Sequence, residues 1–504
     1  MLDESLPPDP DRATGARSTR VGERRLWIDA APWLLGLVAY FSLQVYAMSL
    51  QLGSVFWPFT DAFEYASMAR WMVAGEGAVL RVGPAFFPAR VPPTLSVLLL
   101  PQALFSDPRD YWQTVFAIGV AAVLGFWRLA RALGLGRSGA LCAAALLAAS
   151  PGFASYAGYV MSDVPALALL LLILGCALRW FRRAGDARVA LLVAALASGV
   201  LVALRSTHAV WLLALAIVTP VAVWRDLARR PLRLGAALAL LAAPLAALAL
   251  YQWRSFGSPT ATGYSFWLDA NRFFGWQYAA KNLDFYLMQL VGVRSEILAQ
   301  PLGPTSDLYV LPVALAGLAG IARIANGDRF DAAARRIFLA AAIGTAATLA
   351  LFAFVRWHDW RFLLPVAAWL AFGGGALADA CRARFGVAGA IVLGALLLFS
   401  TLVLAALPLG ARDSVAPVIG SALDADVAAL RAGGDGARIA TTRLPLALTS
   451  VVAPRAVVLV PAPDPVGRDI EVELIRKRKL SPLRVDPGYE ELWRKLVEGR
   501  DVAP

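Results

Sequence analysis

The chain has 504 residues, of which 59% are hydrophobic and only 16% are charged, against roughly 25% charged residues in ordinary soluble domains. Apolar runs long enough to cross about 30 Å of hydrocarbon recur along most of the sequence, which excludes a soluble globular protein and predicts an all-α, polytopic membrane protein. The formal charge of +12 comes from basic residues between these runs, so membrane topology explains it and no nucleic-acid partner is predicted.

The first 25 residues are polar and carry no apolar pattern, which predicts a disordered cytoplasmic tail. Four arginines then precede the apolar stretch 27–50: Arg17, Arg20, Arg24 and Arg25. This stretch is too long for a cleaved signal peptide, and no small-residue cleavage pattern follows it. It is therefore predicted to be a first span with its N-terminus in the cytoplasm.

The stretch FTDAFEYASMARWMVAGEG, residues 59–77, follows the first span. Apolar residues at helical spacing predict an amphipathic helix over 62–74, lying at the membrane surface. Asp61 would be its N-cap, and Glu64 would complete a capping box. Capping accounts for both acids, but Asp61 also stands at the outer mouth of the predicted bundle, where an acid can do chemistry.

The positive-inside rule decides the number of spans. If the short segment 92–106, interrupted by Pro101, does not cross the membrane, five basic turns all face the cytoplasm and together carry 17 arginines. Those turns are 128–137, 179–188, 225–233, 322–336 and 381–386. The segment 92–106 is then half-inserted on the outer side. Eleven spans follow, near 27–50, 111–128, 138–155, 164–181, 189–204, 208–224, 232–253, 306–322, 337–355, 361–380 and 387–408.

This topology divides the chain into three parts. A membrane domain covers 26–408, with extracytoplasmic loops at 51–110 and 254–305. Residues 409–504 are predicted to form a small extracytoplasmic α/β domain with nothing that looks catalytic. Its predicted strands are 437–442 and 455–461, and its predicted helices are 424–433, 444–452 and 488–498. Three cysteines lie in or at the inner ends of spans and have no metal-ligand spacing: Cys142, Cys176 and Cys381.

Other polar residues gather at the outer ends of spans. Asp163, with Pro165 just after it, fits an N-cap followed by a first-turn proline. The turn RWHDWRFLLP, 356–365, fits an interfacial belt of tryptophans and arginines, but guanidinium groups at this depth also suit phosphate oxygens. Arg205 lies at the same level. Both histidines of the chain, His208 and His358, lie there too, but they predict no histidine metal site.

Several motifs occur in an order that agrees with this topology. They are D-x-x-x-Y-x-x-x-A at Asp61, Tyr65 and Ala69 with Gly75 and Gly77 beyond, Pro92–Pro93, Ser150–Pro151, SDVP at 162–165, FGSPTATGY at 256–264 and RFLLP at 361–365. Over roughly residues 27–461 the chain resembles the GT-C superfamily of polyprenyl-phosphate-dependent glycosyltransferases, in particular bacterial relatives of the protein O-mannosyltransferases and the lipid A aminoarabinose transferases.

The resemblance implies that Asp61 is the catalytic acid/base residue, and that Asp163 is a second acid on the acceptor side or at a metal. Many relatives carry an acid directly after the first one. Here Ala62 stands in that place, which weakens a paired carboxylate or a metal at that spot. No cofactor is specified, and a divalent metal remains open. The aromatic segment 264–286 would lie near the donor lipid or the acceptor.

The predicted activity is transfer of a sugar from a polyprenyl phosphate to an acceptor hydroxyl on a glycolipid, an envelope polymer or a protein, with inversion. Asp61 is the predicted base, with Tyr65 and Glu64 in support. The predicted donor-phosphate partners are Arg361, Arg356, Arg205 and His358. The enzyme would lie in the bacterial inner (cytoplasmic) membrane, with its active site on the extracytoplasmic face.

Two other functions stay open. An O-antigen polymerase or ligase also has many spans and large outer loops that use arginine on lipid-linked sugars, but it would lack the early helix headed by Asp61. A transporter of lipid-linked sugars would show internal repeats and polar residues near the bilayer midplane. The spans of this chain are instead rich in Leu and Ala, and its polar groups gather at one face.

Overall fold

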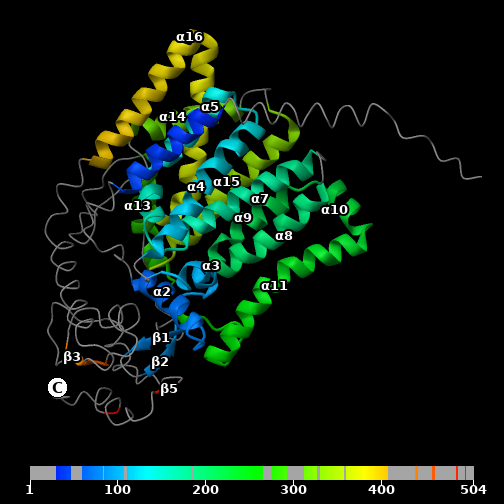
Figure 1. Ribbon diagram of the computed structural model, residues 1–504. Helices are drawn as coiled ribbons and strands as arrows, with labels where there is room; N and C mark the ends of the chain where they lie inside the picture. The colour runs from blue at the N-terminus through cyan, green and yellow to red at the C-terminus, as the bar shows by residue number, and fades with distance from the viewer. Residues whose placement is uncertain are drawn as a thin grey trace, which may run out of the picture.

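The computed structural model describes residues 30–46, 60–82, 85–106, 110–182, 187–264, 274–291, 311–325, 330–356 and 359–406, with short segments at 438–440, 457–459, 484–485 and 494. Long apolar helices lie side by side in a bundle, and short helices and strands gather at one end of it (Figure 1). The hydrophobic core runs through the bundle and continues into these short elements.

Each predicted span falls on a helix. These helices are Ala30–Tyr46, α4 (Trp112–Ala132), α5 (Arg137–Ala149), α7 (Asp163–Phe181), α8 (Ala187–Leu204), α9 (Ala209–Val218), α10 (Val221–Ala228), α11 (Pro231–Phe256), α14 (Leu311–Ala325), α15 (Ala332–Ala353) and α16 (Leu364–Ala406). Within the described residues, 6 helices are long and apolar enough to cross a membrane, or 7 if the pair bent by 94° at α9–α10 is one span. The other predicted spans fall on shorter apolar helices and on the second arm of α16. The chain is a multi-pass membrane protein.

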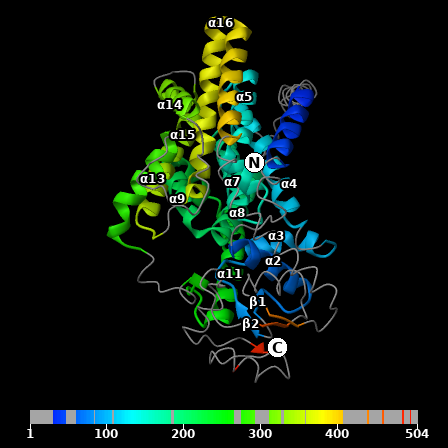
Figure 2. The same ribbon diagram turned by 90° about the vertical axis from the view of Figure 1, so that its left-hand side faces the viewer.

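Helix α16 covers two predicted spans because it is broken in the middle. Gly386 interrupts it with φ of 71° and ψ of −163°, a backbone conformation that glycine adopts without a steric penalty. The two arms fold back on each other as a hairpin (Figures 1 and 2). The break lies at the end of the predicted inner turn 381–386. The first arm packs closely on α14, since a Cβ on Gly320 would lie 1.8 Å from the carbonyl oxygen of Gly373.

Three of the five basic turns that were predicted to share one side of the membrane meet at one end of the bundle. Arg182 forms an ion pair of 2.6 Å with Asp331 and donates a hydrogen bond to the carbonyl of Ala132. Asp379 accepts hydrogen bonds from the backbone N–H groups of Gly136 and Gly139. These contacts join the turns at 128–137, 179–188 and 322–336 to the end of the first arm of α16, next to the turn at 381–386.

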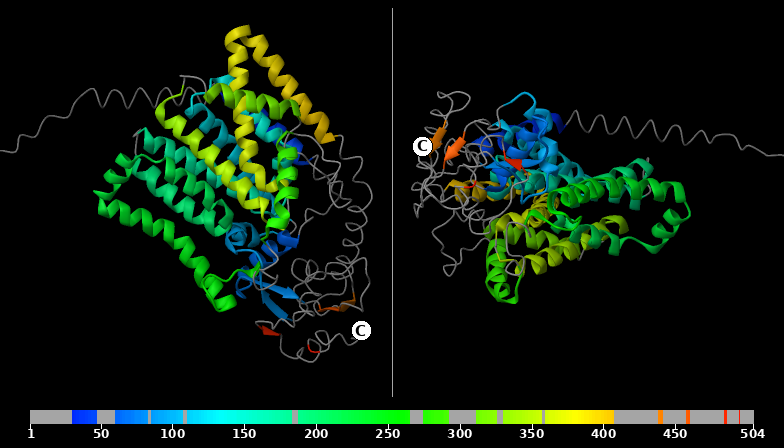
Figure 3. Two further views of the ribbon diagram at one scale, coloured as in Figure 1. Left: turned by 180° about the vertical axis from the view of Figure 1, so that it is seen from behind. Right: turned by 90° about the horizontal axis from the view of Figure 1, so that it is seen from below.

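The short elements lie at the opposite end of the bundle. They are α2 (Thr60–Val73), the antiparallel strands β1 (Val79–Val82) and β2 (Ala85–Pro88), and α3 (Thr94–Ala103). Helix α3 packs on α2 and α8. Its 10 residues extend about 15 Å, which is too short to cross the bilayer and agrees with the prediction that 92–106 does not span it. Helix α11 runs along the outside of the bundle over α8 (Figure 3), and most of its surface is exposed, as suits a lipid-facing helix.

The C-terminal part contributes three short strands to the described structure. β3 (Arg438–Ala440) and β4 (Val457–Leu459) pair in parallel at the two predicted strand positions. β5 (Arg484–Val485) was not predicted, and it adds to the β1–β2 hairpin by antiparallel pairing with β2. The predicted helices at 424–433, 444–452 and 488–498 lie outside the described residues, apart from residue 494, which is helical. The tail at 1–25 also lies outside them.

Candidate functional site

Helix α2 carries the first two candidate acids and is enclosed on nearly all sides. The buried residues of its first turns are Ala62, Glu64, Tyr65, Ala66, Ser67, Met68 and Ala69. The prediction that this helix is amphipathic is therefore wrong for this half of α2. The periodic apolar residues are real, but α3 and the β1–β2 hairpin cover the remaining sides.

Glu64 binds Arg90, which follows strand β2. Its carboxylate accepts hydrogen bonds from the backbone N–H of Arg90 (2.7 Å) and from the guanidinium Nε (2.5 Å), and the N–H of Val91 lies at 3.4 Å. The predicted capping box is wrong, because Glu64 turns to the β2–α3 connection and not back to residue 61. Burial raises the pKa of Glu64, and the charge of Arg90 opposes this shift.

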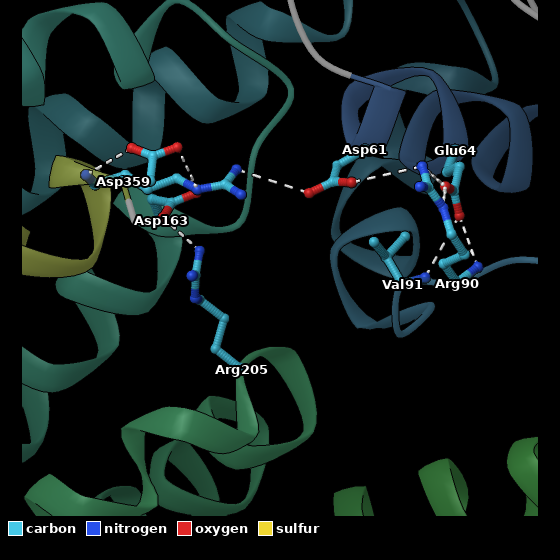
Figure 4. Close-up of polar contacts among 8 residues, drawn as sticks. Asp61, Glu64, Arg90, Val91, Asp163, Arg205 and Asp359 are labelled. Atoms are coloured by element: carbon cyan, nitrogen blue, oxygen red, sulfur yellow. Dashed lines mark hydrogen bonds and ion pairs between the residues drawn. The ribbon is translucent and has the colours of Figure 1, made fainter. Parts of the chain in front are cut away.

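Asp61 lies in the first turn of α2 and faces two guanidinium groups. Its carboxylate oxygens lie 3.7 Å from Nη2 of Arg90 and 3.7 Å from Nη1 of Arg361. Both are ion-pair distances but too long for hydrogen bonds. Figure 4 shows Asp61 between Glu64 and Arg90 on one side and Asp163, Asp359 and Arg205 on the other. Its side chain is 19% exposed, whereas that of Glu64 is fully buried.

Arg361 reaches Asp61 from the 3₁₀ helix η6 (Trp360–Leu363). Asp359 caps η6 by accepting a hydrogen bond from the backbone N–H of Arg361 (3.0 Å), and its second oxygen lies 3.1 Å from the guanidinium Nε. Burial raises the pKa of Asp359, against the effect of the Arg361 charge. The backbone N–H of Asp359 in turn donates to the hydroxyl of Tyr286 (3.4 Å), which belongs to α13 (Ala279–Val291).

Asp163 forms a buried ion pair with Arg205, the residue that follows α8. Ser162 occupies the N-cap position of α7, so the prediction that Asp163 is the N-cap is wrong. The ion pair uses one carboxylate oxygen, Oδ1. The other, Oδ2, is buried and has no hydrogen-bond partner among the described residues. The pair lies directly beside the Asp359–Arg361 pair, as Figure 4 shows for Asp163 and Asp359.

Two tyrosines line the site near Asp61. Burial, with a further contribution from the Asp61 charge, raises the pKa of both Tyr65 and Tyr264, so both phenols are protonated at neutral pH. Tyr264 ends the FGSPTATGY segment, and the glycine before it explains part of that motif. A Cβ on Gly263 would lie 2.2 Å from the carbonyl oxygen of Ala89, so glycine permits this loop to touch the backbone next to Arg90.

Arg356 and the two histidines were also noted in the sequence at this outer level. Arg356 is exposed, unlike Arg205 and Arg361. His358 lies outside the described residues. His208 is buried at the start of α9. In the part of the chain that the structure describes, no group of three or more His, Cys, Asp or Glu side chains could hold a metal ion. The acids of the site are instead paired with arginines, so this donor set does not fit a metal.

Sequence reasoning missed two residues of the site. Arg90 stands in PARVPP, where nothing but the adjacent prolines marks the segment, and its partners are 26 residues or more away. Asp359 was noticed within the turn 356–365 but received no role. Its spacing of two residues from Arg361 is the signal that could have assigned it, because a 3₁₀ turn lets a capping acid reach that guanidinium.

Comparison with known proteins gives a result at the level of the fold. No protein-family model matches the sequence, and no protein of curated function matches it. Among solved structures, the chain is similar to ArnT from Cupriavidus metallidurans in the apo state, with TM-score 0.60 and 14% identity over 93% of this chain and 91% of ArnT. It is also similar to the same protein bound to undecaprenyl phosphate, with TM-score 0.61, 14% identity, and coverage of 92% and 91%. The chain has the fold of GT-C glycosyltransferases.

The oligosaccharyltransferase of Archaeoglobus fulgidus in the apo form has the same fold, with TM-score 0.52 and 15% identity over 84% of this chain. The match covers 64% of that protein, so this chain spans less than two thirds of its length. The resemblance expected from the sequence motifs is thus confirmed for the GT-C fold. The resemblance was drawn from short, scattered motifs. At sequence identities this low, the comparison supports similarity of fold.

Proposed function

We propose that the protein transfers a sugar from a polyprenyl-phosphate donor to an acceptor hydroxyl at the outer face of the cytoplasmic membrane. The GT-C fold supports this reaction class, since ArnT is known in complex with undecaprenyl phosphate and the archaeal oligosaccharyltransferase AglB in complex with a dolichol-phosphate. The position of the site supports the outer face, because it lies at the end of the bundle away from the arginine-rich turns.

The observation that carries the proposal is the combination of contacts and exposure at the Asp61 carboxylate. Within the described residues its carboxylate accepts no hydrogen bond, and it is partly exposed, with guanidinium groups 3.7 Å away on two sides. Glu64 is fully buried and bound to Arg90, and Asp163 is buried and bound to Arg205. Asp61 is therefore the acid best placed to meet a substrate hydroxyl.

The reaction follows from this placement. Asp61 accepts the proton of the acceptor hydroxyl while the oxygen of that hydroxyl forms a bond to the anomeric carbon. The bond from that carbon to the phosphate oxygen breaks, and the polyprenyl phosphate leaves with the electron pair. A single displacement inverts the anomeric centre. A positioned base of this kind contributes about 10²–10⁴-fold to the rate.

The departing phosphate gains negative charge, which fixed cations stabilise in a partly water-excluded site. Arg361 and Arg205 were proposed for this role from the sequence, and Arg90 joins them because it flanks Asp61 from the other side. Each guanidinium has five N–H donors and can bind its carboxylate partner and a phosphate oxygen together. Arg356 and His358 come from the same turn and complete the proposed set of phosphate partners.

The test is mass spectrometry of envelope glycolipids, polymers and glycoproteins from a strain deleted for the protein and complemented with variants. Asp61→Asn should restore no sugar transfer while inserting normally. Asp331→Asn is the matched control, because Asp331 is also an aspartate beside an arginine but lies at the other end of α15. A sugar mass that returns with Asp61→Asn would remove Asp61 from the chemistry. A change in polymer length in place of a single added residue would favour a polymerase.

A further inference from the structure

The ring of Phe362 lies beside two arginines of the site, Arg205 and Arg361. The guanidinium carbon of Arg205 is 5.5 Å from the ring centroid, and that of Arg361 is 5.3 Å from it. Both distances are within the range of cation–π attraction. The two arginines come from separate parts of the fold, Arg205 from the end of α8 and Arg361 from η6. The Phe362 ring thus contacts arginines from two elements.

The ring is held in a fixed plane by its own packing. Phe352, in the last turn of α15, stacks on it with centroids 4.0 Å apart and an angle of 6° between the planes. The next residue along the chain, Leu363, is fully buried and anchors η6 in the core. This packing therefore restrains the orientation of the Phe362 ring.

Each of the two arginines contacts different acids of the site. Arg205 binds Asp163, and Arg361 binds Asp359 and reaches Asp61. Two like charges near one ring repel each other, and cation–π attraction to that ring offsets part of this repulsion while restricting where each guanidinium can lie. We propose that Phe362 is a positioning residue that holds Arg205 and Arg361 together as one anion-binding pair for the donor phosphate.

This inference rests on the proposed function, and it concerns donor binding and not the proton transfer at Asp61. It predicts that the ring acts through the arginines. Loss of the ring should weaken binding of a polyprenyl phosphate by about tenfold, which corresponds to about 1.4 kcal/mol and is within the range of two cation–π contacts. The value of kcat at saturating donor should change less than KM for the donor.

The experiment measures binding of undecaprenyl phosphate to the full-length protein in nanodiscs by native mass spectrometry, with the thermal unfolding midpoint of each variant. Phe362→Leu keeps the apolar character and removes the ring, and Phe362→Tyr keeps the ring. Phe385→Leu is the matched control. Its ring also lies beside an arginine, Arg384 at 5.6 Å, but it belongs to the break in α16 at the opposite end of the bundle. We expect weaker binding for Phe362→Leu alone.

A double-mutant cycle separates positioning from packing. Phe362→Leu should cost less binding in an Arg205→Ala background than in the wild type, because one of its two partners is already gone. An equal cost in both backgrounds, or wild-type binding by Phe362→Leu, would overturn the inference and leave the proposed function standing. Failure of the wild-type protein to bind undecaprenyl phosphate would overturn the proposed function, and this inference with it.

Discussion

Glu64 holds Arg90 by its main chain and its side chain at once, with the carboxylate 2.7 Å from the backbone nitrogen and 2.5 Å from Nε. This contact fixes the guanidinium at 3.7 Å from Asp61. The acid that a capping-box pattern would assign to helix stability is thus the residue that joins the β1–β2 hairpin to α2 and places a cation beside the proposed base.

Replacing Glu64 with Ala should therefore destabilise the protein strongly. It removes the carboxylate that binds a guanidinium only 11% exposed and leaves Asp61 as the acid 3.7 Å away; loss of one partner from a buried pair costs about 3–5 kcal/mol. Asp226→Ala is the comparison, since that carboxylate is 46% exposed and its ion pair with Arg230 is worth at most about 1 kcal/mol. The measurement is the thermal unfolding midpoint in detergent. Equal shifts for the two variants would show that burial does not increase the contribution of the Glu64–Arg90 pair to stability.

The buried pair of Asp163 and Arg205 predicts a non-additive result. Arg205→Met alone leaves the 2% exposed carboxylate of Asp163 without its cation, and one of its oxygens already has no hydrogen-bond partner among the described residues. Adding Asp163→Asn removes the buried charge, so the double variant should be more stable than Arg205→Met. Thermal unfolding of the three variants measures the coupling. Losses that simply add would mean that the two residues do not share one interaction.

Protonation of Asp359 should affect the shape of the acidic limb of the pH–rate profile. Its pKa is raised by burial and by the nearby charge of Asp163, whereas Arg361 and Arg205 oppose the shift. As the pH falls, Asp359 therefore takes up a proton at a higher pH than an ordinary aspartate and loses its ion pair with Arg361. If Asp61 must also be ionised, the wild-type limb should approach a slope of about two in log rate per pH unit.

Asp359→Asn carries no titrating group at this position, so its slope should fall to about one and its plateau rate should be lower. The assay is transfer of the sugar identified by mass spectrometry, measured at saturating donor. A limb in Asp359→Asn that matches the wild type would show that the ionisation of Asp359 does not control the site.

The spans and the outer cluster could be predicted because they depend on composition along the chain. Hydropathy and the arginine-rich turns place every predicted span on a helix, and the outer-end residues Asp61, Asp163, Arg205 and Arg361 come together in one site. The partners of these residues could not be predicted, because they depend on how distant segments pack. Asp163 and Glu64 both fit local capping patterns, yet each binds an arginine from another element. Such long-range pairs leave no periodic signal in the sequence.

The last prediction concerns how the Asp359–Arg361 turn is held. Asn282 of α13 is buried, and its amide nitrogen lies 3.2, 3.1 and 2.5 Å from the carbonyl oxygens of Phe352, Ala353 and Val355. These are carbonyls at and just beyond the C-terminal end of α15, where the helix itself supplies no donors. The same helix α13 accepts the N–H of Asp359 through Tyr286. Asn282 thus fixes the backbone from which Asp359 and Arg361 extend.

Asn282→Asp exchanges this donor for an acceptor of the same size and should cost about 1–3 kcal/mol in stability. Thr348→Val is the control, because the buried Thr348 hydroxyl of α15 donates to the carbonyl of Gly344 and accepts from the indole N–H of Trp211, away from the turn. Both variants should lower the unfolding midpoint, whereas only Asn282→Asp should raise KM for the donor. If Thr348→Val raised KM equally, loss of helix stability in general would explain the effect, and Asn282 would have no specific part in placing Arg361.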